Sequence, residues 1–337
     1  MSKATFNRQN KAHPIPRKAL VKVTEMNHIV ELVYTHNVSN TLEKYVKLDK
    51  NSYAVIERET GEVLEVKDYE IKENRAQNIA GLKRSMKKIR DLINNNFTGG
   101  LNELFITLTY ALVDGKPMTD TKKASRDFQT FIKRFKRKFH DAVWLAVLEP
   151  QASGAWHWHL LVKFTDWKSP AQIRIDNNEV IFPLWGHGWT KTKSLNRVDN
   201  IGAYLGGYLS SVEISEENRE EIFDTVYKSG RDLSIEEKEV TGANGKKISK
   251  KFVKGGRLHL YPSGTNIYRC SREIKPPKTQ NITYGEAKEL VGNRPPDYAQ
   301  TVIVESGERD EHHNSRQFNK IVYENYNLKR NSTTPAK

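Results

Sequence analysis

Two histidines separated by a single residue stand within an apolar run of the sequence, WHWHLLV, at His157 and His159. Successive side chains of a β-strand alternate between its two faces, so on a strand both imidazoles would point the same way and Trp158 the other way. Neighbouring imidazoles on one face favour a metal site. The alternative interpretation is a pair of histidines packed into a core.

A carboxylate stands close by in the sequence, at Glu149. The runs VWLAVLEPQ and WHWHLLVKF are joined by a short segment around Gly154, which predicts a β-hairpin. Pairing of residues 143–149 with 156–162 would place the carboxylate near the turn, within reach of the two imidazoles. Two imidazoles and one carboxylate leave coordination positions open, which suits a divalent ion that must also hold substrate oxygens.

Two tyrosines follow the histidines at a spacing of four, at Tyr204 and Tyr208. On a helix this spacing places both phenols on one face, where they could reach a single cleft. The alternative is a pair of core aromatic residues in an amphipathic helix. Glycines at 202, 206 and 207 weaken the helix, so we expect the close approach of another backbone or of a ligand to compensate.

The elements that must position these residues follow a simple order. LNELFITLTY, at residues 101–110, alternates in the manner of a strand with one buried face. A helix is predicted within 119–140, then the hairpin, and then a short helix within 198–211 that begins near Asp199 or Asn200. The order strand, helix, strand, strand, helix predicts an α+β fold.

The helix predicted within 119–140 is strongly basic. Its apolar stripe consists of Phe128, Phe131, Ile132 and Phe135. Cations cover the remaining surface, and these candidate nucleic-acid contacts are Lys133, Arg134, Lys136, Arg137 and Lys138. A solvated helix surface without a partner is the alternative interpretation.

The whole chain is basic, with 55 Lys and Arg against 41 Asp and Glu in 337 residues and a formal net charge of +14. This balance indicates a polyanionic partner, and nucleic acid is the leading candidate. No stretch approaches the roughly 20 apolar residues of a membrane-spanning helix, and the polar N-terminus lacks the apolar core of a signal peptide. We therefore expect a cytoplasmic protein without a membrane partner. The single cysteine, Cys270, is expected to be a half-buried small side chain.

Shifts in composition divide the chain into six segments. They are a flexible basic arm (1–20), a β-rich unit with a helix (21–98), the core with the candidate site (99–212), an exposed insertion (213–250), strands that pack on the core (251–300) and a polar tail (301–337). The tail is expected to be ordered only in part.

This combination resembles the HUH endonucleases, and within them the rolling-circle replication initiators of bacterial plasmids and phages. The resemblance rests on the strand FITLTY at 105–110, the His-x-His inside GAWHWHLLV at 154–162 and the Tyr-x-x-x-Tyr at 204–208. LWGHGW and VDNIGAY are also similar, and a looser likeness extends through RLHLYPSGTNIYRCSREIKPP. The likeness covers about 100–212 well and does not include the first 95 residues or the tail.

The resemblance implies an HUH-type core, in which helices flank a central antiparallel sheet. It implies that His157 and His159 bind Mg²⁺ or Mn²⁺, with Glu149 as the third ligand, and that Tyr204 and Tyr208 supply the nucleophile. Attack on single-stranded or hairpin origin DNA would leave a 5′-phosphotyrosine and a free 3′-hydroxyl, so the strand could be rejoined without ATP. Because a free tyrosine has a pKa near about 10, attack at neutral pH needs a cation that stabilises the developing charge.

One position departs from the family pattern. Many members carry a lysine next to the second tyrosine, where this chain has Gly207 before it and Leu209-Ser210-Ser211 after it. The resemblance therefore does not identify the basic group that assists. Tyr204 is expected to react first, because single-tyrosine relatives keep the equivalent position. A host helicase and polymerase are expected to act in trans, in the cytoplasm of a bacterial host.

Three other interpretations stay open. A relaxase or transposase of the same superfamily would use similar residues, although relaxases usually place the tyrosine before the histidine motif. A catalytically inactive origin-binding regulator would keep the basic surface without the chemistry. A structural zinc protein would use His157, His159, His187 and Cys270, at a spacing that matches no common zinc site.

Overall fold

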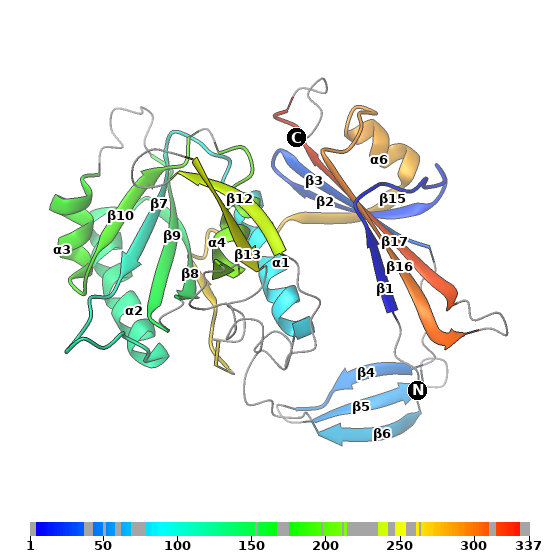
Figure 1. Ribbon diagram of the computed structural model, residues 1–337, viewed down its shortest axis with the longest axis horizontal. Coiled ribbons are helices and arrows are strands. Elements are labelled where there is room, and N and C mark those ends of the chain that lie inside the picture. The colour runs from blue at the N-terminus through cyan, green and yellow to red at the C-terminus, as the bar shows by residue number, and fades with distance from the viewer. Residues whose placement is uncertain are drawn as a thin grey trace. The chain divides into compact units, whose positions relative to one another are not determined.

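The computed structural model forms two compact units. Unit 1 comes from the two ends of the chain, within Met1–Lys72 and Lys278–Lys337, and unit 2 lies within Glu73–Pro277 (Figure 1). The structure describes residues 5–36, 43–49, 52–57, 62–68, 79–151, 154–166, 175–196, 198–210, 212–213, 235–241, 247–253, 261–262, 264–309 and 315–330.

Unit 2 is built on a five-stranded antiparallel sheet in the order β10-β7-β9-β8-β14. Its strands are β7 (Glu103–Thr109), β8 (Ala142–Pro150), β9 (Trp156–Phe164), β10 (Thr190–Ser194) and β14 (Tyr268–Cys270). The β8–β9 hairpin predicted from the sequence is present, and its register pairs Glu149 with His157 and Val147 with His159.

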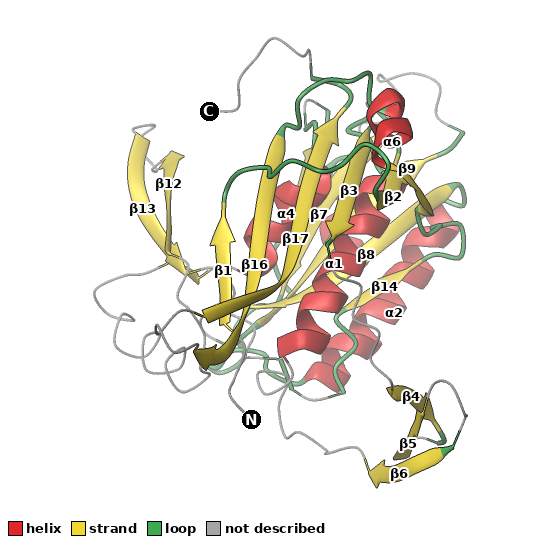
Figure 2. Cartoon of the chain, turned by 90° about the vertical axis from the view of Figure 1, so that its right-hand side faces the viewer, coloured by secondary structure: helices red, strands yellow, loops and turns green. Residues whose placement is uncertain are grey.

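Helices lie against this sheet (Figure 2). The longer ones are α1 (Ile79–Asn96), α2 (Thr121–Lys138) and α4 (Ile201–Ser210), and two short ones, η3 (Asn177–Ile181) and α3 (Phe182–Trp185), precede β10. Helix α2 packs on the face that carries Trp158, whose ring stacks on Phe128 with centroids 4.2 Å apart. Helix α4 packs on the other face, where the ring of Tyr204 meets the edge of Phe105.

Both faces of β7 are therefore buried, which corrects the expectation of one buried face. Phe105 is 6% exposed although it points away from the face of Leu104 and Ile106. The sequence pattern missed this because an aromatic residue among threonines is compatible with a solvent-facing row, whereas α4 covers it.

Unit 1 holds a six-stranded antiparallel sheet in the order β1-β16-β17-β3-β2-β15, with helix α6 (Tyr284–Leu290). The strands are β1 (Thr5–Gln9), β2 (Leu20–Met26), β3 (Ile29–Thr35), β15 (Lys278–Thr283), β16 (Tyr298–Arg309) and β17 (Ser315–Asn327). Its core joins Val23 and Leu32 to Val322, Tyr326 and Ala287, so the two ends of the chain share one hydrophobic cluster.

Two smaller antiparallel sheets complete the described elements. One contains β4 (Glu43–Lys47), β5 (Ser52–Glu57) and β6 (Val63–Asp68) in that order. The other contains β11 (Val212–Glu213), β13 (Lys247–Val253) and β12 (Ile235–Thr241). The segment predicted as an exposed insertion, 213–250, lies largely outside the described residues.

The grouping of the chain ends differs from the segments expected from composition. Residues 5–9, expected within a flexible arm, form β1 and pair with β16. Most of 301–330, expected as a tail ordered only in part, belongs to β16 and β17. Strand β14 joins the unit 2 sheet as expected for 251–300, but β15 pairs with β2 in unit 1. These pairings join residues about 300 positions apart, which local periodicity does not report.

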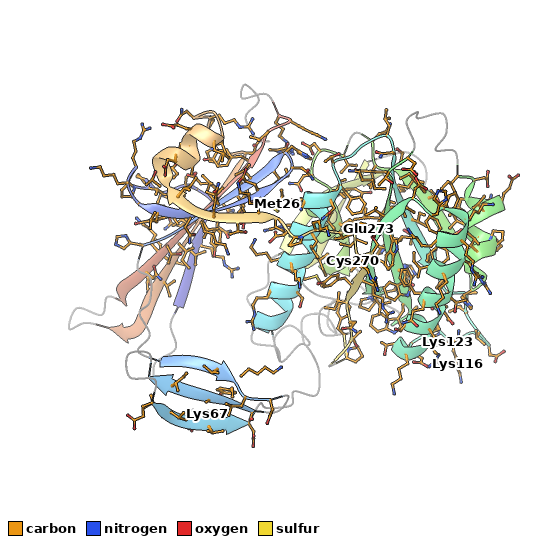
Figure 3. The ribbon with its side chains drawn as sticks, turned by 180° about the vertical axis from the view of Figure 1, so that it is seen from behind. Met26, Lys67, Lys116, Lys123, Cys270 and Glu273 are labelled. Carbon is orange, nitrogen blue, oxygen red and sulfur yellow. The ribbon has the colours of Figure 1, made fainter. Side chains whose placement is uncertain are left out.

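Cys270 ends the edge strand β14 (Figure 3). Its side chain is exposed, so the expectation of a half-buried cysteine was wrong. The overall architecture is mixed α/β with antiparallel sheets, which is compatible with the predicted α+β class. None of the described helices is long and apolar enough to cross a membrane.

Candidate functional site

Alternate residues of β7, β8 and β9 point to one face of the unit 2 sheet, here called the histidine face. The register aligns Thr109 with His157 and His157 with Glu149, so these three side chains form one cross-strand row. The next row aligns Thr107 with His159. The sequence prediction that both histidines share one face, with Trp158 on the other, agrees with this register and with the contact between Trp158 and α2.

His159 is held between two polar partners. Its Nε2 is in hydrogen-bond contact with the Glu149 carboxylate, and its Nδ1 lies 3.3 Å from the Thr107 hydroxyl. A neutral imidazole has one donor and one acceptor nitrogen, so Nε2–H donates to the carboxylate and Nδ1 accepts from the hydroxyl. Both His159 and Glu149 are buried, at 7% and 3% exposed. Sequence reasoning missed Thr107, although a threonine within an apolar strand was a visible signal.

His157 has a nitrogen without a partner. Its Nε2 is buried and makes no hydrogen bond within the described part of the chain. The ring centroids of His157 and His159 are 6.2 Å apart. Burial lowers the pKa of both imidazoles to about 4, and the neighbouring His159 contributes to the shift at His157. Near neutral pH both rings are therefore uncharged, the form in which histidine binds metals.

The donor types on the histidine face fit a divalent ion. Two neutral imidazoles and a carboxylate are available, and the buried Nε2 of His157 is an atom that a ligand would satisfy. Among the described residues, however, no three His, Cys, Asp or Glu side chains are already arranged to hold an ion. Binding would require the proton between His159 and Glu149 to leave and the His157 side chain to turn.

Tyr204 lies close to this pair through a single ring. Phe105 stacks on His159 with centroids 5.3 Å apart, and its ring also meets Tyr204 edge-on, with centroids 6.5 Å apart. Tyr204 is half-buried, whereas Leu205 beside it is fully buried. Tyr208 belongs to α4, but its side chain lies outside the described residues.

Helix α4 is held in place by α1. The Asn94 side chain accepts a hydrogen bond from the Gly202 backbone N–H at 2.8 Å, and Asn200 caps the helix by accepting from Ala203 N–H. A Cβ at Gly202 would lie 2.6 Å from the Asn94 oxygen, so only glycine fits there. The predicted close approach is thus present at Gly202, where the approaching groups are side chains of α1. At Gly206 a Cβ would meet no atom of the described residues within 4 Å.

Helix α2 presents the predicted basic surface. Lys133, Arg134, Arg137 and Lys138 are exposed. Lys136 differs, because its ammonium donates to the backbone carbonyls of His140 and Ala142. It therefore satisfies groups at the C-terminal end of the helix.

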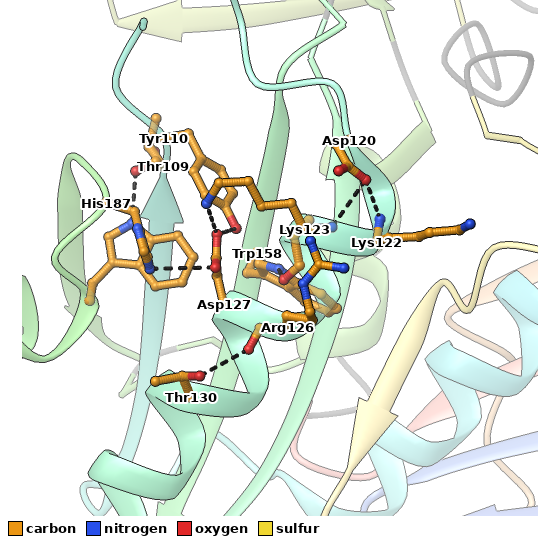
Figure 4. Close-up of polar contacts among 12 residues, drawn as sticks. Thr109, Tyr110, Asp120, Lys122, Lys123, Arg126, Asp127, Thr130, Trp158 and His187 are labelled. Carbon is orange, nitrogen blue, oxygen red and sulfur yellow. Dashed lines mark hydrogen bonds and ion pairs between the residues drawn. The ribbon is translucent and has the colours of Figure 1, made fainter.

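A second polar cluster joins α2 to the segment before β10 (Figure 4). The Asp127 carboxylate accepts from the Tyr110 hydroxyl at 3.1 Å and from the Lys123 ammonium at 2.6 Å, and lies 3.8 Å from His187 Nε2. Burial and the Asp127 charge raise the pKa of Tyr110, and burial lowers the pKa of His187. We call these four residues the Asp127 clamp. Sequence reasoning missed it because its members are far apart in the chain.

The zinc alternative is not supported by these positions. His187 contacts Asp127 and the Tyr110 and Trp185 rings on the α2 side of the sheet, away from the histidine face. Cys270 is exposed on an edge strand. The four proposed zinc ligands do not meet in the described structure.

The candidate site lies within a segment that matches a known family. Residues 103–213, about a third of the chain, match the family model of the replication-associated protein ORF2. This segment contains β7, β8, β9 and α4, and thus both histidines, Glu149 and both tyrosines. Among curated proteins, none matches the chain. Through residues 103–213, the chain belongs to the ORF2 family of replication-associated proteins, which are rolling-circle replication initiators.

Proposed function

We propose that this initiator nicks single-stranded or hairpin origin DNA through Tyr204. The phenol oxygen forms a bond to the scissile phosphorus while the bond from phosphorus to the 3′-oxygen breaks. The phenol loses its proton, and the departing 3′-oxygen gains one. The products are a 5′-phosphotyrosine and a free 3′-hydroxyl, and the reverse exchange of the same two bonds rejoins the strand without ATP.

One observation carries this proposal. The Phe105 ring touches both His159 and Tyr204, so a helix and the histidine face meet at a single aromatic side chain. A nucleophile one ring away from a cluster of metal-binding residue types is the arrangement that phosphoryl transfer requires. A tyrosine that only filled the core would have no reason to adjoin the polar pair of His159 and Glu149.

The metal ligands in this proposal are His157, His159 and Glu149. A bound Mg²⁺ or Mn²⁺ would supply Lewis acid stabilisation of the charge that develops on the phosphate. Thr107 orients the His159 ring through its hydroxyl, and burial keeps both imidazoles neutral. Glu149 keeps a negative charge at the site, which favours a cation.

Tyr208 is proposed as the second nucleophile, in a later strand transfer. The exposed cations of α2, Lys133, Arg134, Arg137 and Lys138, are proposed to contact DNA phosphates. We further propose that a host helicase and polymerase extend the free 3′-hydroxyl in the bacterial cytoplasm.

Covalent capture from a randomised pool tests this function whatever the sequence of the origin. The protein is incubated with single-stranded oligonucleotides of random sequence and Mn²⁺, denatured, and the DNA that stays attached is sequenced. We expect adducts on wild type, none in EDTA, and none with His157→Ala. A plasmid-borne origin would be recovered as an enriched sequence.

The tyrosine variants identify the nucleophile. Tyr204→Phe is expected to abolish the first adduct, while Tyr208→Phe retains it and loses strand transfer. Tyr268→Phe, a half-buried tyrosine of β14, serves as the matched control and should match wild type. DNA that binds without an adduct in wild type would instead establish a non-catalytic origin-binding regulator.

A further inference from the structure

The edge strand β10 carries a basic row on the histidine face. Its register pairs Lys191 with Thr107 and Lys193 with Phe105. Directly paired residues of antiparallel strands point to the same face, so both lysines share the face of His159. Both are exposed, and neither has an ion-pair partner within the described residues.

Trp189 extends this row by one step. The Thr109 backbone N–H donates to the Trp189 carbonyl at 2.8 Å, so the pairing of β10 with β7 continues to this residue. Trp189 thereby stands at the end of the cross-strand row that contains Thr109 and His157. Its side chain is 74% exposed, whereas Trp158 and Trp185 are each 1% exposed. An indole left in water costs hydration free energy that burial would recover, which indicates a partner.

The position of Trp189 is fixed from both sides. Gly188 before it has a φ of +150°, and a Cβ there would lie 2.3 Å from the backbone nitrogen of Ala111. The Ala111 N–H donates to the His187 carbonyl, and the Asp127 clamp holds the His187 side chain. The indole is therefore presented by an ordered backbone.

We propose that Trp189, Lys191 and Lys193 form a track for single-stranded DNA along the edge of the sheet. The indole stacks on a nucleobase, and the two ammonium groups contact successive phosphates. Alternate residues on a strand are about 7 Å apart, and Trp189 lies two strands, about 10 Å, from His157. The inference rests on the proposed function, since it names residues that guide the strand to that site.

Single-stranded DNA fits this row better than a protein does. The row combines cations with an aromatic plane, the pair of features that binds unpaired strands without sequence preference. Bases of a duplex are stacked within it and offer no free face to the indole. Substitution of Trp189 should therefore weaken binding to a single strand and leave duplex binding unchanged.

Binding is measured in EDTA, by fluorescence anisotropy of a labelled mixed-sequence single strand and its duplex, so that no cleavage interferes. We expect Trp189→Ala to weaken single-strand binding about 5- to 150-fold, and Trp189→Phe to restore most of it. Phe182→Ala, an aromatic residue of α3 that is 44% exposed, is the matched control and should bind like wild type.

The lysines are tested through the salt dependence of the same binding. Lys191→Gln and Lys193→Gln should each reduce the slope of log K against log salt by about 0.7. Trp189→Ala should leave this slope unchanged, because stacking releases no counterions. Lys22→Gln, an exposed lysine on β2 of unit 1, is the control.

The outcomes separate this inference from the proposed function. Adduct formation by wild type, together with single-strand binding that Trp189→Ala does not change, would overturn the track and keep the nickase. Weakened binding without any adduct in wild type would keep the track and overturn the nickase. Equal losses for single strand and duplex would also overturn the track, because they would indicate a general loss of structure or charge.

Discussion

At the scale of single residues, the burial of His157 predicts a pH dependence of stability. Its pKa in the folded chain is about 4, below the ordinary value of 6.5. Between these values the unfolded chain binds a proton that the folded chain excludes, so stability falls as pH drops from about 6.5 through about 4. Above about 6.5 the contribution is fully present.

Urea unfolding in EDTA, followed at pH steps from 7 to about 4, measures this effect. We expect His157→Gln to have a shallower loss of unfolding free energy on the acid side, by on the order of 1 to 2 kcal/mol. His140→Gln, at an exposed site after α2, should follow the wild-type curve. Parallel curves for wild type and His157→Gln would show that this imidazole is protonated equally in both states.

At the scale of elements, the seat of α4 on α1 depends on one glycine. A Cβ at Gly202 would lie 2.6 Å from the Asn94 oxygen and 2.8 Å from Arg90 Cγ. Gly202→Ala should therefore push α4 away from α1, lower stability by about 1–3 kcal/mol and reduce adduct formation through Tyr204. Thermal unfolding and covalent capture measure the two effects.

Gly206→Ala is the matched control in the same helix. Its Cβ would meet no described atom within 4 Å, and alanine favours a helix over glycine by up to about 1 kcal/mol. This variant should be at least as stable as wild type and keep its activity. If both alanine variants lose stability equally, the contact with Asn94 is not what positions α4.

The same elements show what sequence can and cannot predict. The pairing of Glu149 with His157 was predictable, because a short hairpin leaves few registers and strand alternation places both histidines on one face. The position of α4 was signalled by its glycines. Trp189 was missed as a functional residue, because its exposure depends on the turn at Gly188 and on a pairing with β7 that local pattern does not reveal. Lys136 looked like a DNA contact, yet its ammonium binds two carbonyls.

At the scale of the whole molecule, the two units have separate cores. The cluster of unit 2 runs from Ile89 to Ile274, and the cluster of unit 1 joins Ile15 and Leu32 to Val322 and Tyr326, with no residue in common. Unit 1 can only form once both ends of the chain are present, because β3 pairs with β17. Cooperative unfolding within each unit should therefore respond to its own core.

A pair of cavity variants tests this independence. Leu32 is 1% exposed in unit 1 and Leu160 is 0% exposed in unit 2, and a buried Leu→Ala change costs about 2–5 kcal/mol. Hydrogen exchange read by mass spectrometry reports the two units separately. Leu32→Ala should speed exchange in β2, β3 and β17 while β7 and β9 keep their protection, and Leu160→Ala should do the reverse. A uniform rise in both units after either change would mean that they unfold as one, and the histidine face would then depend on the far ends of the chain for its stability.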